Sequence, residues 1–129
     1  MKKALVLTAI VCFSLLTAKA QLTNSKWKGV LKIPNDNGDL MATPVTWDFS
    51  NDTATVSYDN GNVPDVMTYK VEKNAISFKK VSGNVPCDND MVLVCSFEIK
   101  NDQLFLKQIQ DACKARATVD VSQPFDRVK

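Results

Sequence analysis

The sequence of 129 residues contains no histidine. Such a chain has no imidazole metal ligand and cannot use a histidine general base or a Ser-His-Asp triad. Cysteine is also scarce, with four residues, and the spacing from Cys87 to Cys95 does not match a zinc site, for which a fourth ligand is missing as well. We therefore expect no catalytic residue, no metal and no cofactor.

A surplus of charge of one sign is missing too. The chain has 16 Lys and Arg against 14 Asp and Glu, but Lys2, Lys3 and Lys19 belong to an N-terminal leader. Without them, 13 basic residues face 14 acidic ones, so the mature chain has a net charge of −1. This balance argues against a nucleic-acid partner recognised through a basic patch.

No apolar run is long enough to cross a membrane. The longest, residues 4–16, has about 13 residues, whereas a ~30 Å hydrocarbon core needs about 20. It follows Lys2 and Lys3 and precedes Ala18-Lys19-Ala20, which is the pattern of a signal peptide cleaved after Ala20. We therefore expect residues 1–20 to be a signal peptide, residues 21–129 to be one domain, and the protein to be periplasmic or secreted.

The mature chain consists of short segments in which apolar and polar residues alternate, separated by clusters of Asn, Asp, Gly and Pro. Period-2 alternation is typical of β-strands with one buried face. The expected strands cover residues 27–33, 45–49, 53–58, 66–71, 75–81, 91–100, 103–109 and 121–128.

The connections alternate in length. Those after the first, third, fifth and seventh strands are long, and the three between them are tight turns. In an up-and-down meander all odd connections lie at one end, so the pattern predicts an all-β, eight-stranded antiparallel barrel with a long-looped mouth and a tightly turned base. A two-sheet sandwich is the alternative that period-2 strands leave open. The last long loop, residues 110–120, is expected to hold a helical turn capped by Asp111.

Three cysteines remain after the leader is removed. Cys87 and Cys113 both fall in mouth loops that flank neighbouring strands, so a disulfide between them is geometrically allowed. Cys95 lies at an inward position of the sixth strand, which favours a buried free thiol. Spacing alone leaves open a pairing of Cys87 with Cys95.

Inward positions carry large apolar side chains on almost every strand. If the barrel is hollow, a small lipophilic ligand entering past residues 34–42 and 82–90 would meet seven of them: Ile33, Val45, Trp47, Tyr58, Met67, Phe78 and Leu93. The same aromatic residues could instead fill the barrel completely, since eight strands enclose little space. The loops would then bind a protein partner, as in a secreted protease inhibitor, or the domain would be an accessory one.

Two further groups of side chains are placed by the same alternation. Met41, Met67 and Met91 precede or open strands at the mouth, where flexible thioethers would either suit an apolar opening or fill gaps in the upper core layer. Asp48, Asp65 and Glu98 are expected to point outward, which leaves no inward carboxylate pair for acid–base catalysis.

The first and last strands of a closed barrel are neighbours, which brings Trp27 and Arg127 together at the base. A guanidinium over an indole there would be a structural contact that seals the barrel.

Four segments of the chain carry a family resemblance: residues 25–29 (SKWKG), 85–87 (VPC), 111–116 (DACKAR) and 125–129 (FDRVK). With these, residues 24–129 resemble the bacterial lipocalin-like domains of the calycin group. Lipocalins place a strand-one Trp against a late Arg, as Trp27 and Arg127 would lie; their Gly-x-Trp motif has Ser25 here in place of Gly. The resemblance implies binding of a small apolar or amphipathic molecule inside the barrel, without catalysis.

Overall fold

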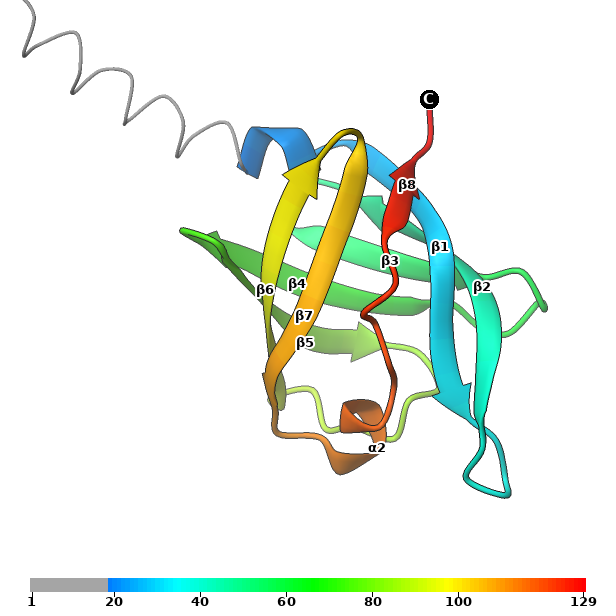
Figure 1. Ribbon diagram of the computed structural model, residues 1–129. Helices are drawn as coiled ribbons and strands as arrows, with labels where there is room; N and C mark the ends of the chain where they lie inside the picture. Colours follow the sequence, from blue (N-terminus) through cyan, green and yellow to red (C-terminus); the bar gives the residue numbers. More distant parts are fainter. Residues whose placement is uncertain (1–18) are drawn as a thin grey trace, which may run out of the picture.

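The computed structural model describes residues 19–129, and most of the predicted signal peptide, residues 1–18, lies outside that range. Eight antiparallel strands follow one another around a closed barrel in chain order (Figure 1). The strands are β1 Ser25–Pro34, β2 Leu40–Phe49, β3 Thr53–Tyr58, β4 Asp65–Glu72, β5 Ala75–Ser82, β6 Val92–Lys100, β7 Gln103–Asp111 and β8 Phe125–Arg127. The predicted fold class is confirmed, and the sandwich alternative is excluded by the closure of the sheet.

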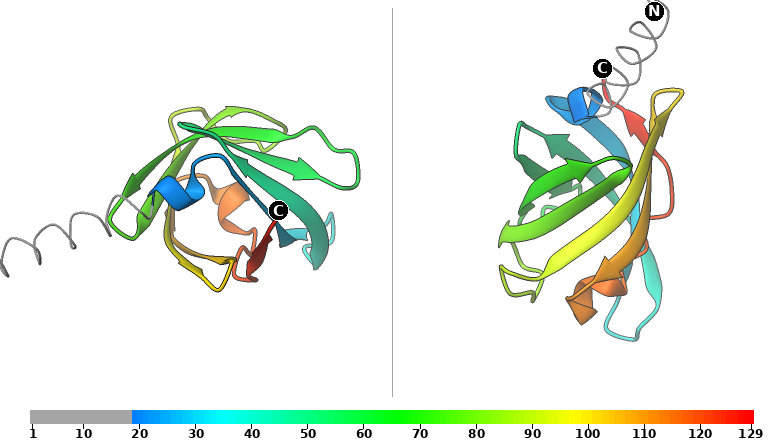
Figure 2. Two further views of the ribbon diagram at one scale, coloured as in Figure 1. Left: turned by 90° about the horizontal axis from the view of Figure 1, so that it is seen from above. Right: turned by 90° about the vertical axis from the view of Figure 1, so that its left-hand side faces the viewer.

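The alternation of loops is confirmed as well. The turns after β2, β4 and β6 are short, and Asn101 and Asp102 between β6 and β7 both have positive φ, at 53° and 58°. This conformation is that of a type I′ turn, which Asn and Asp tolerate well and which matches the twist of a hairpin. The long connections all lie at the opposite end, the mouth, where the single turn of helix α2 (Lys114–Ala117) is found (Figure 2).

Two strands differ from the prediction by more than two residues at one end, and the other strand ends lie within two residues of it. β2 begins at Leu40 rather than at residue 45, because residues 40–44 pair with the end of β1 in a long hairpin. β8 is only three residues long, although residues 121–128 were expected. Pro124 lies directly before it and has no N–H to donate to a sheet, which limits strand pairing there.

β8 nevertheless closes the barrel at its base. It pairs with β1 through Trp27 and Arg127 and with β7 through Leu104 and Phe125. The Arg127 guanidinium lies 4.3 Å from the centroid of the Trp27 ring, and its Nε lies 3.4 Å from Asp102 Oδ1. Leu22, which precedes β1, is fully buried against the same end of the core. This end of the barrel is therefore closed.

Aromatic side chains fill the interior from the base of the barrel to its middle. Trp47 stacks on Phe49 with ring centroids 5.6 Å apart and contacts Phe78 and Phe125 at 5.5 and 6.2 Å. Gly29 is required beside this cluster, because a Cβ at that position would lie 2.4 Å from Cδ1 of Phe125. The cluster forms a layer across the barrel between its base and its mouth.

Candidate functional site

A cavity of about 250 Å³ occupies the mouth half of the barrel. Its apolar walls are formed by side chains from five strands, from the β3–β4 and β5–β6 loops and from the segment between α2 and β8, with Trp47 of the aromatic layer among them. The apolar and sulfur-containing lining residues are Leu31, Ile33, Trp47, Val56, Val63, Met67, Val85, Leu93, Cys95, Val119 and Val121. The barrel is thus filled in one half and hollow in the other.

Five of the seven predicted ligand-contacting residues line this cavity, and two do not. Ile33, Trp47, Tyr58, Met67 and Leu93 line the cavity. Val45 and Phe78 are buried in the core and do not line it. Alternation along a strand tells which face a residue occupies but not how deep it lies along the barrel axis, and Phe78 belongs to the aromatic layer.

Of the three methionines expected at the opening, only Met67 lines the cavity. Met41 is 54% exposed, because it lies on the β1–β2 hairpin, which projects beyond the neighbouring strands (Figure 1). Met91 lies in the loop before β6 and contributes its backbone carbonyl to a hydrogen bond from Arg116.

Polar side chains form a ring at the level of the mouth, which we call the rim ring: Tyr58, Asp65, Lys80, Gln108 and Arg116. The first four come from β3, β4, β5 and β7, and Arg116 comes from α2. Sequence reasoning recovered only Tyr58. The period-2 alternation did place two of the others on the inward face. Lys80 shares its parity with Ile76 and Phe78, and Gln108 shares its parity with Leu104 and Leu106.

The prediction that Asp65 points outward is wrong. β4 begins at Asp65, so this residue has the same parity as Met67 and Tyr69, and it is only 9% exposed. Its Oδ2 accepts a hydrogen bond from the Tyr58 hydroxyl. Gly83 is needed next to it, because a Cβ there would lie 2.0 Å from Asp65 Oδ1. Within residues 19–129, no Lys or Arg nitrogen lies within 4 Å of this carboxylate.

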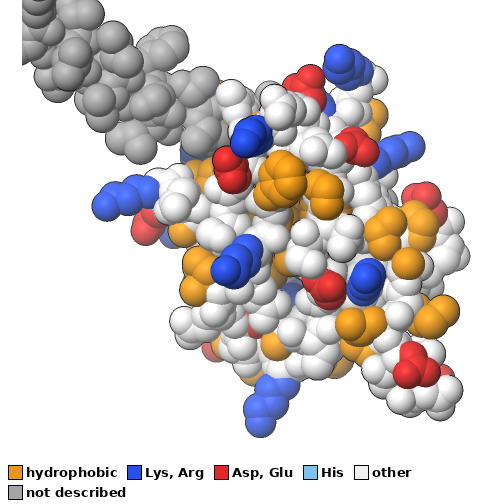
Figure 3. All heavy atoms as spheres, viewed as in Figure 1, with side chains coloured by type: hydrophobic (Ala, Val, Ile, Leu, Met, Phe, Trp, Pro, Cys, Tyr) orange, Lys and Arg blue, Asp and Glu red, His pale blue; other side chains and the backbone are white. Residues whose placement is uncertain are grey.

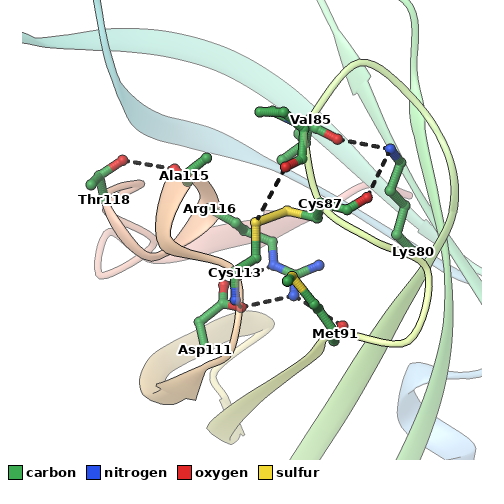
Figure 4. Close-up of a disulfide and its surroundings, with 10 residues drawn as sticks. Lys80, Val85, Cys87, Met91, Asp111, Cys113, Ala115, Arg116 and Thr118 are labelled. Carbon is green, nitrogen blue, oxygen red and sulfur yellow. Dashed lines mark hydrogen bonds and ion pairs between the residues drawn. A yellow bond between two sulfur atoms is a disulfide. The ribbon is translucent and has the colours of Figure 1, made fainter.

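The Cys87–Cys113 disulfide joins the loop between β5 and β6 to the segment before α2, with an S–S distance of 2.05 Å. This confirms the allowed pairing and leaves Cys95 as the buried free thiol. Figure 4 shows the disulfide together with Lys80 and the Asp111–Arg116 pair at this corner of the mouth. Lys80 Nζ donates to the carbonyl oxygens of Val85 at 2.8 Å and Cys87 at 3.2 Å, which anchors the loop that carries Cys87.

Asp111 does not cap α2 as expected; Cys113 occupies the N-cap position. The carboxylate instead forms a buried ion pair with Arg116. Arg116 Nε lies 2.7 Å from Oδ2 and Nη2 lies 2.8 Å from Oδ1, which also accepts from the Cys113 N–H at 2.9 Å. Nη2 donates in addition to the Met91 carbonyl at 3.2 Å. Together with the disulfide, this pair fixes α2 across the mouth.

Two groups of the cavity have a raised pKa. Burial raises the pKa of the Cys95 thiol to about 12, and the nearby Asp111 carboxylate adds to the effect. The pKa of Tyr58 is also raised, first because burial desolvates the phenolate and then because Asp65 accepts its hydrogen bond and repels a second negative charge. Both groups are therefore neutral near pH 7.

The Tyr58 shift gives a testable pH dependence. The folded state keeps the phenol proton above pH 10, where an unfolded tyrosine loses it. The contribution of this group to stability is thus complete below pH 10 and is lost as the pH rises through the folded-state pKa. The chain has two tyrosines, so a pH titration of tyrosinate absorbance should show two ionisations in the wild type and one in Tyr58→Phe. The ionisation that the variant lacks should be one that occurs well above pH 10. Ionisation of Tyr58 near pH 10 in the folded protein would contradict this.

Within residues 19–129, no group of three or more His, Cys, Asp or Glu side chains is arranged to hold a metal ion. In the described part of the chain, no helix is both long and apolar enough to cross a membrane. Over the face shown in Figure 3, acidic and basic side chains are interspersed.

Comparisons of the chain with models of known protein families, with curated proteins and with solved structures find no match. The eight-stranded antiparallel barrel is compatible with the lipocalin resemblance. The cavity and its side chains are therefore the features that bear on function.

Proposed function

We propose that the barrel binds one small amphipathic molecule in the mouth half of its interior, without catalysing a reaction on it. The observation that carries this proposal is the cavity of about 250 Å³ between the aromatic layer and the mouth. A dry cavity of roughly 150 Å³ is enough to hold benzene, so this one accepts a single ring with a short substituent. Its apolar walls would bury the ring, and the rim ring would meet a polar end.

The proposal of binding without catalysis rests on the state of the groups in the cavity. A cysteine nucleophile requires a thiolate, whereas the Cys95 thiol is neutral at pH 7 with a pKa of about 12. The Tyr58 phenol is likewise held in its protonated form by burial and by Asp65. These groups are suited to hydrogen bonding rather than to proton transfer near neutral pH.

The alternative of a protein-interaction barrel assumed a filled interior, and the cavity argues against that assumption. We propose further that the protein is periplasmic or secreted and related to the lipocalin-like domains. The Cys87–Cys113 disulfide supports export, because such bonds persist in oxidising compartments. The closed barrel and the Trp27–Arg127 contact at its base support the relationship.

A cavity-filling substitution tests the binding proposal. Val56 is buried and lines the cavity from β3, so a phenylalanine there would occupy the space of the ligand. We expect ethylbenzene, an uncharged probe, to raise the thermal midpoint of the wild type by a few degrees, since a ligand at ten times its Kd stabilises by about 1.4 kcal/mol. Val56→Phe should abolish this shift.

The matched control is Val66→Phe, which adds the same ring on the outer face of β4, outside the cavity lining. This variant should keep the ligand-induced shift. Because Val56→Phe fills existing space, its unfolding midpoint without ligand should not show the loss of about 1–3 kcal/mol typical of overpacking a dense core. An equal ligand-induced shift of the thermal midpoint in the wild type and in Val56→Phe would contradict the proposal.

A further inference from the structure

The rim ring contains two charged groups of opposite sign, Asp65 and Lys80, that no charged partner among the described residues neutralises. Among residues 19–129, Asp65 accepts a side-chain hydrogen bond from the Tyr58 hydroxyl alone. Lys80 donates to two backbone carbonyl oxygens, which solvate the ammonium group but leave its charge uncompensated. Within the described residues, neither side chain takes part in an ion pair.

The two groups lie on adjacent strands but are held apart. Asp65 is bonded toward Tyr58 on β3, and Lys80 is bonded toward the loop after β5. Both side chains line the same cavity. A charge in a partly buried, largely apolar site is costly unless it is paired, so each of them favours a ligand group of the opposite sign.

Arg116 adds a second cationic hydrogen-bond donor to the rim ring, in addition to Lys80. Its Nε and Nη2 are used by Asp111 and Met91, whereas Nη1 makes no hydrogen bond to the described residues. The side chain lines the cavity while being only 10% exposed. One N–H of Lys80 and the Nη1 group of Arg116 are therefore free to donate to an anionic group at the rim.

We propose that the ligand is a small zwitterion, an amino acid with a large apolar side chain. Its ammonium group would bind Asp65, and its carboxylate would accept hydrogen bonds from Lys80 and Arg116. Its side chain would occupy the apolar cavity between Trp47 and the mouth. The identification rests on the proposed binding function and deepens it. A ligand with one charge would leave either Asp65 or Lys80 uncompensated.

Four molecules with the same ring separate the contributions of the two charges. L-phenylalanine carries both, phenethylamine only the ammonium, 3-phenylpropanoate only the carboxylate, and ethylbenzene neither. Titration calorimetry of the wild type at pH 7 should show that L-phenylalanine binds at least tenfold more tightly than each of the other three. Equal affinity of phenethylamine or of 3-phenylpropanoate would overturn the zwitterion assignment.

Two charge-removing variants assign each head group to its partner. Asp65→Asn should lower the affinity for L-phenylalanine and for phenethylamine about tenfold and leave the affinity for 3-phenylpropanoate unchanged. Lys80→Gln should lower the affinity for L-phenylalanine and for 3-phenylpropanoate and leave the affinity for phenethylamine unchanged. Thermal unfolding of both variants checks that they fold, and the wild-type series alone decides the question if one does not.

The outcomes distinguish this inference from the function on which it rests. If ethylbenzene binds as well as L-phenylalanine, and Val56→Phe removes that binding, the cavity function stands and the zwitterion assignment fails. If none of the four molecules binds, both fail.

Discussion

Replacing Asp111 with alanine should lower the free energy of unfolding by about 3–5 kcal/mol, because it leaves the Arg116 guanidinium buried without its carboxylate. The Asp111 side chain is fully buried and that of Arg116 is 10% exposed, so water cannot readily replace the lost partner. The variant also removes the acceptor of the Cys113 N–H. Urea denaturation followed by tryptophan fluorescence measures the loss.

The double variant Asp111→Ala, Arg116→Met provides the critical comparison. Removing both charges should restore part of the stability lost in the single variant, since no unpaired charge remains. The surface pair of Lys26 and Asp48, with side chains 59% and 50% exposed, is the control, and Asp48→Ala should cost less than about 1 kcal/mol. Equal losses in Asp111→Ala and Asp48→Ala would show that the buried pair is not a structural element of the mouth.

The double variant Cys87→Ser, Cys113→Ser should be destabilised by about 3–4 kcal/mol, the chain-entropy value for the loop that this disulfide closes. The two cysteines are 26 residues apart in sequence and connect two of the loops that border the cavity. A reducing agent should lower the unfolding midpoint of the wild type toward that of the double variant and leave the double variant unchanged. The measurement is thermal unfolding by circular dichroism with and without reductant.

Cys95→Ala is the matched control for this disulfide. Cys95 is buried and has no disulfide partner, so the variant loses packing but should keep the full response to the reductant. A reductant-insensitive wild type would contradict the role given to the Cys87–Cys113 bond.

The strand number, strand order and the two ends of the barrel could be predicted from the sequence, because they depend on local rules. Inward and outward residues alternate with a period of two, and the Asn101-Asp102 turn and its counterparts have turn-forming residues. These signals need no knowledge of contacts between distant residues.

The division of the interior into a filled and a hollow half could not be predicted in this way. Depth along the barrel axis depends on strand tilt and on the stagger between strands, which alternation does not encode. For this reason Phe78 was assigned to the ligand although it lies in the aromatic layer, whereas Leu31 and Val56, which do line the cavity, were missed. Arg116 was missed because its position depends on its long-range hydrogen bond to Met91 and on the disulfide.

We propose that a small molecule binds in the mouth half of the barrel, whereas the base half is closed. Methyl NMR of residues 21–129 during a titration with ethylbenzene tests it most directly. We predict that the methyl resonances of Leu31, Met67 and Leu93 shift, whereas those of Ile76 and Leu104, which are buried outside the cavity lining, do not. Unchanged cavity methyls at saturating probe, or equal shifts in both groups, would contradict the account.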